Sequence, residues 1–75
     1  MLLSERNKLN AKLRKDCQYL TEHGVTLAYL AANAGIDKSR FSKFMRGTNL
    51  GEKSVLSLRE VLRNDFKWKW VEEIN

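Results

Sequence analysis

Residues 38–46 carry the side chains of this chain that are best suited to binding anions. The segment reads KSRFSKFMR, and its apolar members Phe41, Phe44 and Met45 fall on one side of a helix. The outward positions are then Lys38, Ser39, Arg40, Lys43 and Arg46. The whole chain carries a formal charge of +5, with 14 Lys and Arg against 9 Asp and Glu. This surplus favours a polyanion such as nucleic acid or an anionic membrane, although the same cations suit an ordinary solvated helix face.

Other reactive side chains are sparse. Cys17 is the single cysteine, which excludes an intramolecular disulfide, and with His23 as the single histidine no zinc site can be built from Cys and His alone. Cys17 falls on an apolar helical stripe, where it is expected to be a small core residue. His23 precedes Gly24 at an expected helix end, where a partly charged histidine is favourable. We therefore expect no metal, no cofactor and no enzymatic activity.

The elements that position residues 38–46 follow from length and glycine spacing. A chain of 75 residues with 43% hydrophobic side chains has room for one small core, so residues 1–75 are expected to form a single all-α domain. Gly is favoured just past a helix end, which divides the chain into short helices. The first predicted helix runs from Ser4, as N-cap, to His23, and the second covers about two turns after an N-cap at Thr26. The third runs from Lys38 to Arg46 after a cap at Asp37, and the fourth from Glu52 to Arg63.

The tail is less regular. Phe66, Trp68 and Trp70 alternate as in a strand, but Phe66, Trp70 and Ile74 also fit a helix. We favour a fifth, aromatic helix over about residues 65–74, because a single strand would have no partner. The expected architecture is thus a compact bundle of about five short helices.

Two of these helices resemble a known family. The run TLAYLAANAGIDKSRFSKFMRG, within residues 26–47, is similar to the helix-turn-helix of the lambda-repressor and Cro-like DNA-binding proteins. Small Ala31 stands four residues before Gly35, which supplies the positive φ of a tight turn, and Ile36 and Phe41 fill the angle between the helices. The chain departs from the family at Leu27, where the family often has a phosphate-binding Gln, and at the bulky Phe41.

The resemblance implies roles for individual residues. The second helix of the pair would lie in the major groove of double-stranded DNA, where Lys can pair with guanine O6 and N7. The base-reading candidates are Lys38, Ser39 and Lys43, with Arg40 on the same surface. The candidates for phosphate or flanking contacts are Ser42, Arg46, Thr48 and Asn49.

The resemblance also implies a homodimer, since related repressors dimerise through a C-terminal helix. The expected interface residues are Phe66, Trp68, Trp70 and Val71. Together with Ile74, these residues exceed what one inward helix face can bury, and exposed aromatic clusters mark interfaces. The alternatives are that a small core wraps both Trp side chains, or that the tail lies on a membrane surface, which Glu72 and Glu73 disfavour.

The function expected from these observations is a small sequence-specific transcriptional regulator of a phage or mobile element, which occupies an operator. A truncated N-terminal domain of a longer repressor is also compatible with the sequence. The alternative function is a phage antirepressor with the same fold that binds a repressor protein instead of DNA. The N-terminus does not read as a signal peptide, and the apolar run from Leu27 to Ala32 is too short to span a bilayer. We therefore expect a cytoplasmic location in a bacterial or phage-infected host cell.

Overall fold

Four helices surround one apolar core in the computed structural model, which describes residues 1–65. Helix α1 spans Leu3–Glu22, α2 spans Leu27–Ala34, α3 spans Lys38–Met45 and α4 spans Glu52–Asp65. The described residues contain no strand, so the all-α prediction is confirmed for them. The aromatic tail helix predicted over residues 65–74 lies outside the described residues, except for Asp65, which ends α4.

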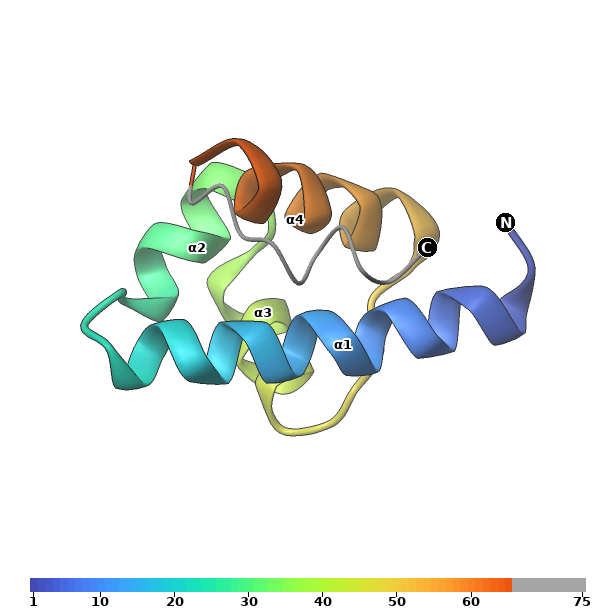
Figure 1. Ribbon diagram of the computed structural model, residues 1–75, viewed down its shortest axis with the longest axis horizontal. Coiled ribbons are helices and arrows are strands. Elements are labelled where there is room, and N and C mark those ends of the chain that lie inside the picture. The colour runs from blue at the N-terminus through green and yellow to red at the C-terminus, as the bar shows by residue number, and fades with distance from the viewer. Residues whose placement is uncertain (66–75) are drawn as a thin grey trace.

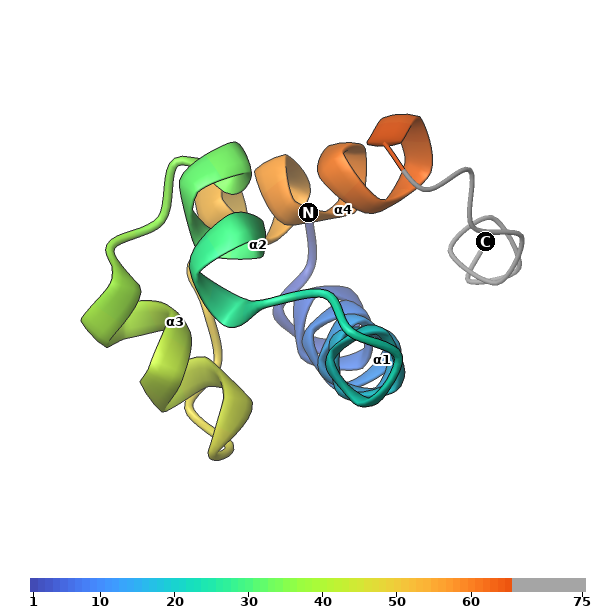
Figure 2. The same cartoon turned by 90° about the vertical axis from the view of Figure 1, so that its left-hand side faces the viewer.

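Helix α1 runs along the length of the molecule, and α2 and α4 lie over it (Figure 1). Helix α2 contacts α4 and α3, and α1 contacts both α4 and α3. Figure 2, in which α1 is seen nearly end-on, shows α3 at the edge of the molecule. This arrangement leaves one side of α3 without a covering helix among residues 1–65.

The core is formed by one apolar stripe from each helix. Leu9, Leu13, Cys17 and Leu20 of α1 are buried, as the helical spacing predicts. Opposite them lie the buried apolar residues of the later helices and of the connections between them: Leu30, Ala31, Ala34, Ile36, Phe41, Phe44, Leu50, Val55, Leu58, Val61 and Leu62. Met45, predicted to point inward, is only half-buried at the edge of this core.

The start of α1 differs from the prediction. Ser4 was predicted as the N-cap, but α1 begins at Leu3 and Leu2 occupies the cap position. The Glu5 carboxylate accepts a hydrogen bond from the backbone N–H of Leu2, 3.3 Å away. A carboxylate three residues into the helix thus satisfies an N–H group before the first turn, so no hydroxyl is needed at the cap.

The connection between α2 and α3 follows its local chemistry closely. Thr26 caps α2 through a hydrogen bond that its hydroxyl accepts from the Tyr29 N–H. Gly35 ends α2 in the left-handed conformation, with φ 68° and ψ 29°. Its conformation is one that L side chains rarely adopt, which explains the glycine at this position. The Ser57 hydroxyl of α4 donates to the Ala34 carbonyl at 2.7 Å, which satisfies one of the last carbonyls of α2.

The later helix ends are close to those predicted. Helix α3 ends at Met45 and Arg46 is its C-cap, one residue earlier than expected. Helix α4 begins at Glu52, as predicted, and extends two residues past Arg63 to Asp65. Within residues 1–65, no helix combines the length and the apolar character needed to cross a membrane.

Candidate nucleic-acid interface

The orientation of α3 is fixed by its two phenylalanines. Phe41 and Phe44 are fully buried, and their ring centroids lie 5.5 Å apart. With that side of the helix in the core, the helical period turns the polar residues toward solvent. The exposed residues of α3 and its C-cap are Lys38, Ser39, Arg40, Lys43 and Arg46, whereas Ser42 is half-buried.

The acidic residue nearest to these cations in the sequence, Asp37, is hydrogen-bonded by the backbone. An oxygen of the Asp37 carboxylate accepts hydrogen bonds from the N–H groups of Ser39 (3.0 Å) and Arg40 (3.3 Å). A carboxylate at this end of a helix is stabilised by the unpaired N–H groups and the helix dipole. Asp37 therefore acts as the N-cap of α3 and is not ion-paired with any of its cations.

Among residues 1–65, the cations of α3 form no ion pair with an acidic side chain. The ion pairs formed among residues 1–65 lie elsewhere: the N-terminus with Glu52, Lys12 with Asp16, and Arg63 with Glu60. The Arg40 guanidinium donates a hydrogen bond to the Ser54 hydroxyl at 3.2 Å, which turns it toward the start of α4. Lys38, Lys43 and Arg46 thus present net positive charge on one exposed surface.

The connection after α3 brings further polar groups to the same surface. Thr48 and Asn49 are exposed, and the Thr48 N–H donates to the Lys43 carbonyl at 3.0 Å. Arg40, Lys43, Thr48, Asn49 and Leu50 line a small hollow of about 60 Å³. Four of the predicted site residues therefore lie together around this hollow. Lys38, Ser39, Ser42 and Arg46 belong to α3 and its C-cap but do not line it.

Two side chains of α1 reach this surface and were not predicted. Arg14 and Asn7 both hydrogen-bond the side chain of Asn49, at 3.0 and 3.2 Å. Beside them, the fully buried Asn10 bonds the backbone of Leu50. A signal is present in the sequence, because residues 7, 10 and 14 share one helical side next to the apolar stripe.

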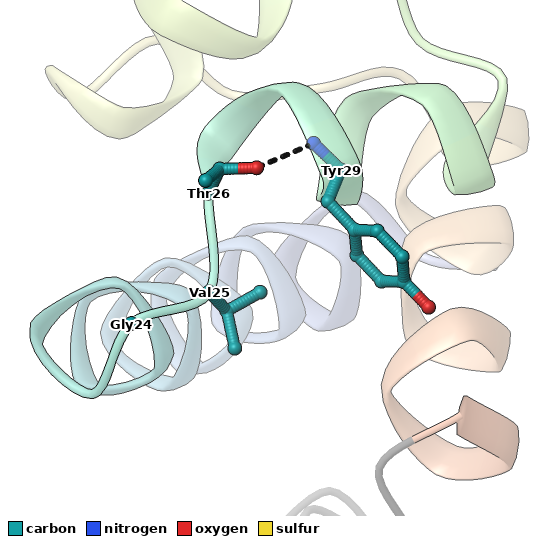
Figure 3. A pocket seen from close by; sticks show the side chains of 4 residues that line it. All are labelled: Gly24, Val25, Thr26 and Tyr29. Carbon is teal, nitrogen blue, oxygen red and sulfur yellow. Dashed lines mark hydrogen bonds between the residues drawn. The ribbon is translucent and has the colours of Figure 1, made fainter.

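A second hollow lies at the other end of α2 and is mainly apolar. Gly24, Val25, Thr26 and Tyr29 line a space of about 310 Å³ where the chain passes from α1 into α2. Figure 3 shows the Val25 side chain and the Tyr29 ring on either side of this space, with the Thr26 hydroxyl bonded to the Tyr29 N–H. A hollow of this chemistry suits an apolar side chain rather than a phosphate.

The titratable groups of the core are shielded from solvent. Burial raises the pKa of the Cys17 thiol to about 12, and the charge of Asp16 adds to the rise. Burial also raises the pKa of the Asp16 carboxyl, while the hydrogen bond and charge of Lys12 oppose that rise. Residues 1–65 hold no cluster of three or more His, Cys, Asp or Glu side chains able to bind a metal ion.

The predicted interface residues Phe66, Trp68, Trp70 and Val71 lie outside the described residues. Comparisons of the chain with protein families, with curated proteins and with solved structures found no match.

Proposed function

We propose that this protein is a small sequence-specific DNA-binding transcriptional regulator that acts by occupying an operator. The observation that carries the proposal is the surface of α3, where Lys38, Lys43 and Arg46 are exposed and have no ion-pair partner among residues 1–65. Lysines and arginines that neutralise DNA phosphates release condensed counterions, which drives binding to a polyanion. The resemblance of residues 26–47 to the lambda-repressor and Cro-like helix-turn-helix supports the same proposal.

In the proposed complex, α3 enters the major groove of double-stranded DNA. Lys38, Ser39 and Lys43 meet base edges, where each lysine is best matched by guanine O6 and N7. The phosphate and flanking contacts come from the remaining polar residues of α3 and the following connection, namely Arg40, Ser42, Arg46, Thr48 and Asn49. Phosphate contacts set register and affinity, whereas base contacts set sequence preference. A homodimer would place two copies of α3 on two half-sites of the operator.

The test is a salt titration of binding to genomic DNA fragments by the wild type, Lys43→Ala and Arg46→Ala. Lys43→Ala should cost about 1–3 kcal/mol on the preferred fragment and relax its sequence preference. Arg46→Ala should weaken all fragments alike and reduce the slope of log K against log salt by about one unit. Arg63→Ala removes the same charge from the last turn of α4, away from α3 in Figure 2, and should leave the preference unchanged.

A second candidate function is an antirepressor that binds a repressor protein. The observation that favours it is the apolar hollow of Gly24, Val25, Thr26 and Tyr29, together with half-buried Leu27 at the first position of α2. An apolar hollow can accept an apolar side chain of a protein partner. In that case the wild type shows no preferred DNA fragment even at low salt, and Val25→Asp weakens binding to a neighbouring regulator. Such a result would reject the DNA-binding proposal.

A further inference from the structure

The connection between α3 and α4 is held in place by side chains of α1. Asn10 bonds both backbone groups of Leu50: its Oδ1 accepts from the Leu50 N–H at 2.7 Å, and its Nδ2 donates to the Leu50 carbonyl at 3.2 Å. The Asn7 Oδ1 accepts a hydrogen bond from the Asn49 Nδ2 at 3.2 Å. Side chains of α1 therefore form hydrogen bonds to two successive residues of this connection, Asn49 and Leu50.

Arg14 makes the contacts that join this connection to α3. Its Nε donates a hydrogen bond to the Phe44 carbonyl in the last turn of α3. Its guanidinium lies 4.8 Å from the centroid of the Phe44 ring, within the range of a cation–π contact. A terminal nitrogen of the same group donates to the Asn49 Oδ1 at 3.0 Å. A single half-buried side chain thus links the end of α3 to the connection that follows it.

These contacts leave specific donors available on the exposed surface. The Asn49 Nδ2 carries two hydrogens, and one of them is donated to Asn7. Within residues 1–65, the other hydrogen has no acceptor, and the Thr48 hydroxyl forms no hydrogen bond. Both residues line the hollow that also includes Arg40 and Lys43. An amide N–H, a hydroxyl and two cations around one hollow match the oxygens of a phosphodiester.

We propose that Arg14 is a positioning residue of the DNA-facing surface: it holds Asn49 and Thr48 in register with α3, so that these two residues bind a backbone phosphate while α3 lies on the bases. This inference rests on the proposed function. Arginine is suited to the role because its planar fork donates in two fixed directions at once and stacks on an aromatic ring. Lysine retains the charge but has no rigid fork with which to hold Phe44 and Asn49 in this geometry.

The experiment is a double-mutant cycle of Arg14→Lys and Asn49→Ala, with binding measured to the preferred fragment and to random DNA. Each single variant should lose roughly ten- to a hundredfold in affinity for the preferred fragment, the scale of one net hydrogen bond to a charged group. The double variant should bind within about threefold of the weaker single variant, because Arg14 acts through Asn49. Arg14→Lys keeps the net charge, so its salt slope should match the wild type. Its affinity for random DNA should fall by a similar factor, because a phosphate contact is made on any sequence.

The matched control is Arg63→Lys, which alters another half-buried arginine, and it should leave both affinities unchanged. Arg63 belongs to the last turn of α4, and that end of α4 lies away from α3 in Figure 2. Thermal melts of all variants identify the temperature range in which they are folded, and binding is compared within that range. A merely structural role of Arg14 would lower the melting temperature and leave the affinity of the folded variant for both DNAs equal to that of the wild type. That result would overturn the inference. A double variant whose loss of affinity equals the product of the two single losses would overturn it as well.

Failure of the proposed function can be distinguished from failure of the inference, because it would already be seen in DNA binding by the wild type. If the wild type has no preferred fragment, DNA recognition and the positioning role of Arg14 in it are both rejected. If the wild type prefers a fragment and Arg14→Lys binds it equally well, the inference alone is rejected.

Discussion

Asn10 is the polar side chain on which the connection between α3 and α4 depends most directly. It is fully buried and bonds Leu50 twice and the Arg6 carbonyl once. An apolar replacement leaves the N–H and carbonyl of Leu50 without partners inside the protein, and such groups are costly when buried. Asn10 therefore stabilises the fold through the groups that it satisfies rather than through apolar contact.

Asn10→Ala should lower the free energy of unfolding by about 2–3 kcal/mol, measured by urea denaturation. Asn33→Ala is the matched control, because Asn33 also bonds the carbonyl four residues earlier, that of Tyr29, but is exposed. Its effect should stay within about 0.5 kcal/mol. Equal losses in the two variants would show that the bonds to Leu50 contribute nothing.

Asp16 should make stability depend on pH. Burial raises the pKa of its carboxyl above the ordinary value of 3.8. The folded chain therefore holds this proton to a higher pH than the unfolded chain, so ionisation of Asp16 costs stability. The cost is absent below pH 3.8 and is fully present above the raised pKa.

Asp16→Asn removes this ionisation and keeps the shape of the side chain. The free energy of unfolding of the wild type, minus that of the variant, should therefore fall as the pH rises from 3 to 7 in parallel urea titrations. Glu22→Gln alters an exposed carboxylate at the end of α1 and serves as the control. A difference that is constant with pH, or that rises, would contradict the assignment.

The pair α2 and α3 depends on small side chains where the helices meet the core. Ala31 is 2% exposed, and its carbonyl accepts the N–H of Ile36, just past Gly35. The Gly35 N–H in turn bonds the Ala32 carbonyl, so two hydrogen bonds close the end of α2. A larger side chain at position 31 has no free volume in a core packed to this degree.

Ala31→Leu should cost about 1–3 kcal/mol, the usual scale of overpacking, seen as a lower midpoint in a thermal melt. Ala32→Leu, at the neighbouring exposed position of the same helix, introduces the same side chain into solvent. It should leave the midpoint nearly unchanged, because Ala and Leu are both good helix formers. A melting midpoint of Ala31→Leu equal to that of the wild type would contradict tight packing around α2.

The whole molecule combines a small core with a charge of +5 and an aromatic tail. Five large apolar residues stand between positions 66 and 74, namely Phe66, Trp68, Trp70, Val71 and Ile74. We propose that they mediate the homodimer that operator binding would use. Association through a few aromatic residues is typical of interfaces, since such residues carry much of the binding energy.

Trp68→Ala should then shift the sedimentation coefficient toward that of a monomer, while circular dichroism shows the helicity of the wild type. Leu3→Ala removes an exposed apolar side chain from the start of α1 and is the control for loss of apolar surface outside the tail. A wild-type protein that sediments as a monomer at high concentration would reject the proposed homodimer.

The sequence by itself determined the features that arise within a few residues of one another. Thr26, Gly35 and Asp37 set the ends of α2 and α3, because a cap and a left-handed turn depend on local hydrogen bonds and on φ. The apolar periodicity likewise predicted most of the core residues, and it predicted that the cations of α3 face outward. The misplaced N-cap at Ser4 shows the limit, since a carboxylate at Glu5 can satisfy the same N–H group from inside the helix.

Only the tertiary structure decided what the polar residues of α1 do. Asn10 and Asp16 are fully buried, although their residue types alone would place them in solvent. Asn10 is buried because Leu50, 40 residues later, offers it two backbone partners. Arg14 bonds Phe44 and Asn49, which are 30 and 35 residues away. A helix period shows which side a residue faces, but the groups that it meets there depend on how distant segments pack.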